Sequence, residues 1–373
     1  EAANQVIASM VRKVGGFTFQ ELNLTIDDIL STSARGADLS YDFVNRPAYH
    51  HAMATADTEF VRLTMRAARD LGVDTVSLVH ALQNHDEMTY ELVHFATLHA
   101  GDTFVFRGAE ILGGDLAQLI RAELTAALSG EAAPYNAIFT TNGIASTTAS
   151  IIAASLGITD LSAITAEQTE AIKRAHLLLA MYNAWQPGVV ALSGWDLVGA
   201  LPLDRTQVAA LIRDGDTRWI HRGAYDLLGY QRDATESTAK MPKATELYGS
   251  LTDQLADPNS FASRLGDILA IRRKYAIATA EQLDIPDVSH KSMLVMVHRL
   301  ADGEQITVLN FSPETIAGSV RSEALTPGSR IVDAVTGVPA GEVDDLHSLY
   351  VALQPHEGRA LLVIPPTPVA SAD

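Results

Sequence analysis

Residues 77–87 read SLVHALQNHDE, an apolar run that stops at a string of polar side chains. Residues 77–82 predict a buried strand, and the polar residues after them predict a loop at its carboxyl end. Similar apolar segments occur at 17–21, 37–43 and 188–193. Because helical or loop segments separate these four runs, their order predicts βαβ units and a parallel sheet in an α/β fold.

Four further segments have the periodicity of helices, and they span residues 1–14, 47–70, 165–185 and 260–277. In the third of them, Thr165 followed by Gln168 predicts a capping box at the start of the helix. The apolar stripe of that helix is Ile172, Ala175, Leu179 and Tyr182. Its helical spacing predicts a face that packs into the core.

Residues 88–160 interrupt this order. They predict one helix at 109–129, and a stretch of small residues follows at 140–149. Structureless connections of this length are uncommon in compact domains and are usually functional. We therefore interpret residues 88–160 as a lid-like excursion inserted into a first domain that covers residues 1–285.

After Pro286 the pattern changes to short apolar runs that alternate with turn residues. This texture predicts an antiparallel β-sandwich domain over residues 286–373. The runs are 293–297, 306–309, 319–320, 330–332, 349–353 and 360–364.

The composition excludes several classes of function. The 373 residues are 47 % hydrophobic and 19 % charged, close to ordinary globular usage. The formal charge of −18 disfavours nucleic acid and anionic membranes as partners. There is no cysteine, which excludes disulfides, thiolate metal sites and cysteine nucleophiles.

The histidine spacings and the glycine pattern predict neither a metal site nor a cofactor. Paired histidines are adjacent or five residues apart, and none has the i,i+4 helical spacing of a zinc motif. The pairs are His50 and His51, His80 and His85, and His94 and His99. No glycine-rich phosphate-binding loop is found. The chain opens at Glu1 without a basic and apolar leader, so we expect a cytoplasmic location.

Two of the predicted strands end in carboxylates, at Glu21 and at Asp86. Asp and Glu at such positions are common as helix caps, so each alone is ambiguous between capping and catalysis. The string Asn84-His85-Asp86 is more specific, because it places three hydrogen-bonding side chains at one strand end. In parallel α/β barrels, catalytic groups lie at the carboxyl ends of the strands.

Residues 82–87 resemble the last signature of the α-amylase family of glycoside hydrolases, in which Asn-His-Asp ends barrel strand seven. Residues 17–21 are similar to that family's strand-five signature, and 36–43 lie where strand six is expected. Residues 216–222 resemble a segment after strand eight of amylosucrase-like members. The resemblance extends over nearly the whole chain. It implies the C-terminal half, strands five to eight, of a (β/α)8 TIM barrel followed by the β-sandwich domain.

The same resemblance implies roles for individual residues. Glu21 is similar to the general acid/base, and Asp86 to the carboxylate that holds sugar hydroxyls and favours the oxocarbenium-like state. Arg218 resembles an arginine that pairs with an acid at the pocket floor. Residues implied to contact the sugar are Tyr41, Asn84, His85, Glu87, Arg218, Trp195 and Asp196. Trp195 lies where the sequence departs from the family's usual motif after strand eight. Packing of its side chain in the wall of the site is therefore an equal alternative to contact with the sugar.

The family's nucleophilic aspartate after strand four and its Asn-His after strand three have no counterpart in the sequence. The resemblance therefore implies that strands one to four lie elsewhere, in the same molecule or beside it. The expected partners are that N-terminal half of the barrel and a disaccharide substrate. A homo-oligomer is also consistent with the sequence.

Within the family, residues 142–157 and 182–188 are most similar to trehalose synthases. The expected reaction is an intramolecular transglucosylation that interconverts maltose and trehalose by retaining double displacement, with glucose as hydrolytic by-product. Two alternatives stay open. One is an amylosucrase-like sucrose glucosyltransferase. The other is a catalytically silent carbohydrate-binding accessory chain.

Overall fold

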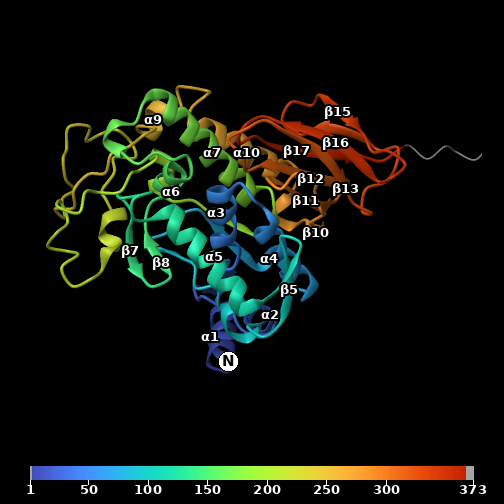
Figure 1. Ribbon diagram of the computed structural model, residues 1–373, viewed down its shortest axis with the longest axis horizontal. Coiled ribbons are helices and arrows are strands. Elements are labelled where there is room, and N and C mark those ends of the chain that lie inside the picture. Colours follow the sequence, from blue (N-terminus) through green and yellow to red (C-terminus); the bar gives the residue numbers. More distant parts are fainter. Residues whose placement is uncertain (1, 367–373) are drawn as a thin grey trace, which may run out of the picture.

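A computed structural model describes residues 2–366, and the end of the second predicted domain, residues 367–373, lies outside them (Figure 1). Four strands form one parallel sheet in the order β1-β2-β3-β9. They are β1 (Phe19–Gln20), β2 (Leu39–Tyr41), β3 (Leu78–Ala81) and β9 (Val189–Ala191). The predicted parallel order of the four strands is confirmed. β1 and β9 are the edges of this sheet, so the described residues do not close it into a barrel.

Six longer helices accompany this sheet: α1 (Ala2–Lys13), α2 (Ile26–Arg35), α3 (Asn45–Thr55), α4 (Glu59–Asp70), α7 (Ala166–Ala184) and α10 (Phe261–Lys274). Short helices and turns are η1 (Thr75–Ser77), η3 (Leu161–Ala163), α8 (Gly194–Val198), η4 (Thr217–His221), α9 (Leu251–Gln254) and η5 (Ile277–Thr279). None of the helices within residues 2–366 is long and apolar enough to cross a bilayer. The sequence did not predict α2.

The single helix predicted at 47–70 is wrong, because the chain breaks into α3 and α4. Ala56 takes a left-handed conformation with φ of 51°, which ends α3. The second domain is hydrogen-bonded to the chain at this break. The Thr58 amide donates to the Lys291 carbonyl at 2.8 Å, and Ser292 Oγ donates to the Ala56 carbonyl at 2.6 Å. These contacts join residues more than 230 positions apart, so the local periodicity of the sequence could not predict the break.

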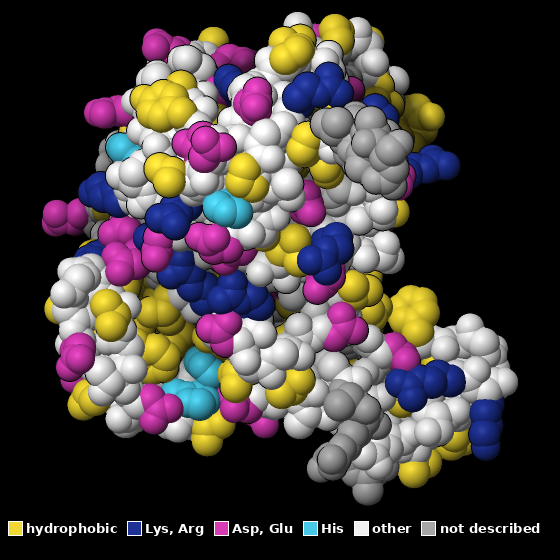
Figure 2. All heavy atoms as spheres, turned by 90° about the vertical axis from the view of Figure 1, so that its right-hand side faces the viewer, with side chains coloured by type: hydrophobic (Ala, Val, Ile, Leu, Met, Phe, Trp, Pro, Cys, Tyr) yellow, Lys and Arg dark blue, Asp and Glu magenta, His cyan; other side chains and the backbone are white. Residues whose placement is uncertain are grey.

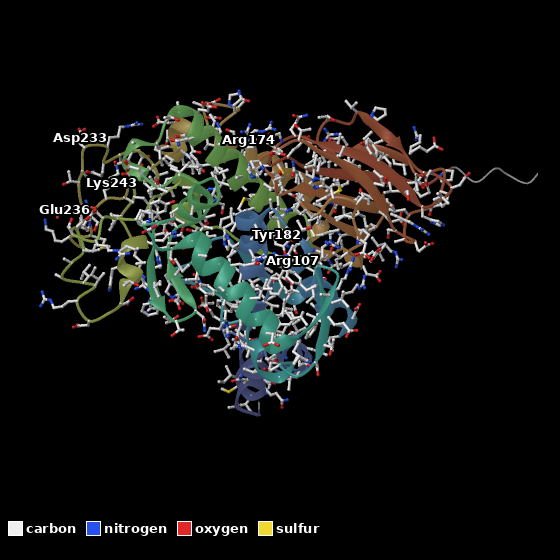
Figure 3. The ribbon with its side chains drawn as sticks, in the orientation of Figure 1. Arg107, Arg174, Tyr182, Asp233, Glu236 and Lys243 are labelled. Atoms are coloured by element: carbon white, nitrogen blue, oxygen red, sulfur yellow. The ribbon has the colours of Figure 1, made fainter. Side chains whose placement is uncertain are left out.

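The N-terminus of α7 is as predicted. The Gln168 amide donates to Thr165 Oγ1 at 3.2 Å, and Gln168 Oε1 accepts from the Thr165 amide at 2.9 Å. All four residues of the predicted stripe are fully buried. Figure 3 shows Tyr182 in the interior, whereas Asp233, Glu236 and Lys243 lie on the long connection at the outer edge.

The segment 88–160 is an ordered layer, so its interpretation as a loop region is wrong. Its elements are β4 (Met88–Thr89), the π-helical turn η2 (His94–Leu98), β5 (Thr103–Phe106), β6 (Ala109–Leu112), α5 (Gly113–Leu128), β7 (Ala137–Thr140), β8 (Gly143–Ala145) and α6 (Thr148–Ser155). The predicted helix begins at Gly113, because residues 109–112 pair with β5 as a hairpin. Leu116, Ile120 and Leu124 of α5 are fully buried in the main core.

Glu123 joins this layer to the rest of the molecule. Its carboxylate accepts from His51 Nε2 of α3 at 2.6 Å and from Arg107 Nη1 at 2.7 Å. The hydrogen bond from His51, together with Arg107 and against the opposing effect of burial, lowers the pKa of Glu123 to about 2. The hydrogen bond from His51 therefore holds α5 on α3, and the ion pair with Arg107 holds it on the turn between β5 and β6.

Glu123→Gln is expected to remove an acid-sensitive part of the stability. The folded pKa lies below the unfolded one, so the carboxylate's contribution is complete above about pH 4.5 and is lost as the pH falls toward 2. We expect the free energy of unfolding to drop by roughly 1–3 kcal/mol at pH 6, since a quarter of the side chain is exposed. Denaturant unfolding at pH 6 and pH 3 checks this. The difference in the free energy of unfolding between the variant and the wild type should be smaller at pH 3 than at pH 6. An equal difference at the two pH values would contradict this prediction. The exposed Glu131→Gln is the control.

The second domain is antiparallel throughout, as predicted, but its sheet includes residues 281–284, which lie before the predicted boundary at residue 286. A six-stranded sheet has the order β10-β11-β12-β17-β14-β15, and β13 pairs with β16. The strands are β10 (Glu281–Asp284), β11 (Met293–Leu300), β12 (Gly303–Asn310), β13 (Ile316–Arg321), β14 (Arg330–Asp333), β15 (Pro339–Glu342), β16 (Ser348–Leu353) and β17 (Gly358–Ile364). Residues Val295, Val297, Ile306 and Val308 contribute to a core within this domain.

The two parts of the chain are tightly attached. Leu294, Met296 and Leu309 of the sandwich belong to the core of the α/β part. Basic and acidic side chains gather along the hollow between the upper and lower parts of the molecule in Figure 2. Arg62 and Arg66 of α4 both contact Asp287, at 3.0 and 2.9 Å. The boundary therefore combines apolar packing with ion pairs.

A buried arginine fixes the turn between α7 and β9. Arg272 of α10 donates to the carbonyls of Ala184 at 2.6 Å and Gln186 at 2.7 Å, and it also contacts the Gly188 carbonyl. Its burial lowers its pKa. The guanidinium thus satisfies three main-chain acceptors that have left water.

Arg272→Met is expected to lower the free energy of unfolding by about 3–4 kcal/mol, because it leaves those buried carbonyls without donors. Denaturant unfolding followed by circular dichroism measures the loss. The neighbouring Arg273 is exposed, so Arg273→Met should stay within about 0.5 kcal/mol of the wild type. Equal stabilities for the two variants would contradict the proposed role of Arg272.

Candidate active site

The carboxyl ends of β1, β2 and β3 meet at one edge of the sheet. Glu21 follows β1 directly, and the loop 82–87 follows β3. One carboxylate oxygen of Glu21, one of Asp86 and a ring nitrogen of His85 lie within 4.8 Å of one another. The structure therefore brings together the two predicted catalytic carboxylates and one predicted sugar-binding residue.

Asn84 connects the two strand ends. Its Nδ2 donates to Glu21 Oε1 at 3.3 Å. Its Oδ1 accepts from the Asp86 amide at 3.1 Å and from Nη1 of Arg46 at 3.2 Å. The amide orientation follows from these partners, since only the oxygen can accept. Asn84 thus sets the position of Glu21 relative to the Asp86 loop.

Arg218 holds Asp86 from the other side. Its Nη1 lies 2.8 Å from Asp86 Oδ1, and its Nε and Nη2 donate to Asp216 at 2.8 and 3.1 Å. The guanidinium lies over the Phe139 ring at 4.3 Å, a cation–π contact. The Arg218 hydrogen bond keeps the pKa of Asp216 below its usual value despite partial burial. Glu87, a further predicted sugar contact, lies 3.7 Å from Arg218 Nη1.

The main chain of the loop is also anchored. The ring of His85 is exposed, but its carbonyl accepts from Arg222 Nε at 2.7 Å and from His221 Nε2 at 3.1 Å. Burial lowers the pKa of His221 to about 4, so near pH 7 this ring is neutral and Nε2 must carry its proton. The sequence did not single out Asp216, His221 and Arg222 as site residues, although all three lie in the segment 216–222 that carried the resemblance.

Tyr41 lies beneath this edge at the end of β2. It is buried, its ring stacks on Phe43 at 4.4 Å, and burial raises the pKa of its hydroxyl. Asp42 beside it is 3.2 Å from Nδ1 of His80. Burial opposes ionisation of Asp42, but the bonds from His80 and Asn45 outweigh it and lower its pKa. The contact between Asp42 and His80 therefore holds the ends of β2 and β3 together.

Trp195 and Asp196 have other partners. Trp195 Nε1 donates to the Gly223 carbonyl at 2.8 Å, and its ring meets Tyr225 edge-on at 5.9 Å. Asp196 is buried and lies 3.2 Å from Nε2 of His176 on α7. No contact in the described residues joins either side chain to Glu21 or Asp86. Their contact with a sugar stays a prediction, and the packing of Trp195 favours the wall alternative.

The cluster of Glu21, His85 and Asp86 has donor atoms at a spacing that metals use. However, Asp86 is already neutralised by Arg218, and Arg222 Nη2 lies 3.7 Å from the same oxygen. A cation placed there would face two guanidinium groups. The arrangement suits hydrogen-bonding to a neutral, polyhydroxylated ligand better than it suits a metal ion.

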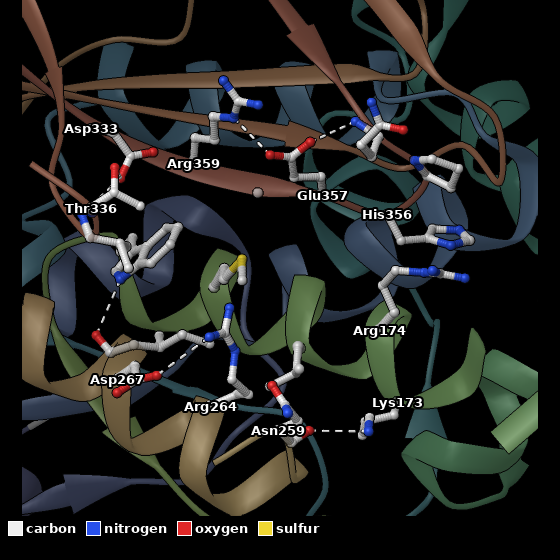
Figure 4. A pocket seen from close by; sticks show the side chains of 18 of the residues that line it. Lys173, Arg174, Asn259, Arg264, Asp267, Asp333, Thr336, His356, Glu357 and Arg359 are labelled. Carbon is white, nitrogen blue, oxygen red and sulfur yellow. Dashed lines mark hydrogen bonds and ion pairs between the residues drawn. The ribbon is translucent and has the colours of Figure 1, made fainter. Parts of the chain in front are cut away.

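A cavity of about 650 Å³ lies elsewhere, between α7, α10 and the sandwich (Figure 4). Charged side chains surround it, including Lys173, Arg174, Arg264, Asp333 and Glu357. None of the residues predicted for the site lines this cavity. Its size therefore does not make it the candidate active site.

No known family's sequence profile and no curated protein matches the chain. Solved structures do match. An α-amylase from Geobacillus thermoleovorans, in complex with acarbose, has a TM-score of 0.55 and 10 % identity over 97 % of this chain and 57 % of that one. An α-amylase from Anoxybacillus has a TM-score of 0.53 and 10 % identity, covering 98 % and 56 %. A trehalulose synthase variant has a TM-score of 0.54 and 16 % identity, covering 96 % and 58 %.

The chain thus spans a little over half the length of these enzymes. At such low identity the similarity establishes the fold alone. The structural neighbours are enzymes of the α-amylase family, and the chain shares with them an α/β part followed by an antiparallel β region, whereas a closed barrel is not seen in residues 2–366.

Proposed function

We propose that this chain carries the acid/base half of a retaining, glucosyl-transferring enzyme of the α-amylase type. The observation that carries the proposal is the convergence of Glu21, His85 and Asp86 within 4.8 Å at the carboxyl edge of a parallel sheet. The α-amylases and the trehalulose synthase among the structural neighbours support it at the level of fold.

In the proposed mechanism, Glu21 protonates the glycosidic oxygen while a nucleophilic aspartate attacks the anomeric carbon. Glu21 then removes the proton from the incoming hydroxyl, which releases the covalent intermediate with retention. Asp86 accepts hydrogen bonds from the sugar hydroxyls, and its negative charge favours the oxocarbenium-like transition state. Arg218 holds Asp86 in position for this role.

The nucleophile would come from four further strands that complete the barrel. Large apolar side chains are exposed at both edges of the sheet. Phe17 is 70 % exposed and Phe19 46 % beside β1, and Leu192 is 48 % exposed beside β9. Unpaired edges and apolar patches of this kind favour association with another part of a sheet. This exposure supports the N-terminal half of the barrel as the partner.

For the reaction itself we propose the interconversion of maltose and trehalose, with glucose as by-product. The test uses the complete barrel, with maltose, trehalose and sucrose supplied separately and the products identified by NMR. Trehalose formed from maltose supports the proposal. Fructose released from sucrose would favour the amylosucrase-like alternative. Saturable binding without turnover of any of the three would favour the silent accessory chain.

We further propose that the 88–160 layer closes the site against water, which isomerisation requires while the covalent intermediate exists. Its β7–β8 hairpin reaches the site, because Phe139 lies under Arg218 and Thr217 Oγ1 donates to the Ile138 carbonyl at 3.2 Å. A deletion of the whole hairpin would disturb the core, since Ile144 and Ala145 are fully buried, so a single substitution is the better test.

Phe139→Ala is therefore the sharper test of closure. It should raise the glucose fraction of the products at least about twofold, because water gains access beside Arg218. The neighbouring Ile138 is 53 % exposed, so Ile138→Ala in the same hairpin is the matched control. An unchanged glucose fraction for Phe139→Ala would show that this hairpin does not exclude water.

A further inference from the structure

A second group of potential ligands lies where α2 meets the π-helical turn η2. It consists of Asp27 in the first turn of α2 and of His94 and His99, which begin and follow η2. One carboxylate oxygen and two ring nitrogens lie within 4.8 Å of one another. In the described part of the chain, the only other group of this kind is the candidate active-site cluster.

The π-helical turn explains why the spacing of His94 and His99 in the sequence did not predict a metal site. Residues five apart lie roughly 140° apart around an α-helix, so two such histidines cannot share a ligand. In a π-helix the hydrogen bond runs between residues five apart. The His99 amide indeed donates to the His94 carbonyl at 3.1 Å, and the two imidazole centroids are 4.2 Å apart. The spacing that is wrong for an α-helix is therefore right for this turn.

The three donor atoms lie close enough together to share one ion. Asp27 Oδ2 lies 2.8 Å from His99 Nε2 and 3.4 Å from His94 Nδ1. An ion with bonds of about 2.0–2.1 Å holds its ligands roughly 3.3 Å apart. Two imidazoles and one carboxylate suit Zn²⁺ better than Ca²⁺ or Mg²⁺, which prefer oxygen ligands. The side chains of Asp27 and His99 are partly exposed, which leaves water access to a fourth position.

Two outer contacts orient these ligands. Asp102 Oδ2 lies 2.6 Å from Nδ1 of His99 and leaves Nε2 directed at Asp27. This carboxylate–histidine arrangement is typical of metal ligands. The Ile26 amide donates to His94 Nδ1 at 3.4 Å, so that nitrogen is an acceptor facing a carboxylate oxygen. Two acceptors directed at each other repel, and a cation between them removes the repulsion.

From this geometry we propose that Asp27, His94 and His99 bind a Zn²⁺ ion. The ion joins the 88–160 layer to α2. Asp27 is six positions beyond Glu21, so the ion also restrains the connection that follows the candidate acid/base. Its role is structural, since none of its ligands contacts the Glu21 cluster.

The test measures zinc in the whole protein after dialysis, loading with ZnCl₂ and removal of free metal. We expect about one Zn²⁺ per chain, and loss of bound zinc in His94→Gln and in His99→Gln. Asp102→Asn keeps every ligand and should weaken binding about 10–100-fold in a competition titration with a chromophoric chelator. His347→Gln, in the sandwich, is the matched control and should bind zinc like the wild type.

His85→Gln separates this site from the active-site cluster, and we expect it to retain the zinc. Loss of zinc in His85→Gln, or retention in both His94→Gln and His99→Gln, would overturn the proposal, as would a wild type without stoichiometric zinc. If the ligand variants do not fold, Co²⁺ loading of the wild type replaces them. The intense visible absorption of tetrahedral Co²⁺ with nitrogen ligands is then the expected result, and a weak octahedral spectrum is the contrary one.

Discussion

Glu21→Gln is expected to lower kcat of the complete enzyme by about 10²–10⁴-fold, because the amide can neither donate the proton to the leaving oxygen nor take it back. Glutamine has nearly the same shape and still offers an oxygen to Asn84 Nδ2, which is 3.3 Å away in the wild type. We therefore expect little change in KM and an unchanged unfolding temperature. Steady-state kinetics with maltose measure the effect.

A substrate with an activated leaving group identifies the step that is lost. α-Glucosyl fluoride needs no protonation to leave, so Glu21→Gln should slow its cleavage much less than that of maltose. The exposed Glu110→Gln is the matched control and should behave as the wild type. Near-normal turnover of maltose by Glu21→Gln would remove Glu21 from the mechanism.

Arg218→Met is expected to lower kcat/KM by about 10²–10³-fold. The variant leaves Asp86, Glu87 and Asp216 close together without the guanidinium that contacts all three. Like charges at this spacing repel one another, so Asp86 is no longer held in its position. Arg218 is a positioning residue in this view, because it acts through Asp86.

The pH profile distinguishes positioning from a merely structural role. With the Arg218 bond gone, the pKa of Asp216 is no longer held down, and the acid limb of the kcat/KM profile should move to higher pH. Arg218→Lys should recover only part of the activity, because an ammonium group cannot make the forked contacts to Asp86 and Asp216. Arg213→Met, at an exposed arginine of the same connection, is the control. A uniform loss at all pH values would contradict the positioning role.

The sequence predicted α7 and the positions of the carboxylates at the strand ends. Thr165, Gln168 and the stripe ending at Tyr182 are local patterns, and the structure has them as predicted. The position of Glu21 and Asp86 at one edge was also expected, because the strands of a parallel sheet all have their carboxyl ends at the same edge. The roles of these two residues in catalysis stay proposals that the variants above test.

Other features depend on partners that are distant in sequence. The break at Ala56 depends on residues 291 and 292, and the pairing of Asp196 with His176 depends on how α7 packs. Arg222 and His221 hold the His85 carbonyl from 136 and more positions away. No local periodicity encodes such contacts.

The sequence by itself determined the order of the four parallel strands, the capping box at the start of α7, the antiparallel pattern of the second domain and which polar residues follow the strands. These are consequences of short-range periods and of backbone groups that must be satisfied within a few residues. The tertiary structure alone decided that Asn84 bridges Glu21 and Arg46, that Arg218 binds Asp86, and that residues 88–160 form a packed layer. It also decided that a π-helical turn brings His94 and His99 together against Asp27. The physical reason is that side chains meet according to the path of the whole backbone, which packing selects among many locally acceptable conformations.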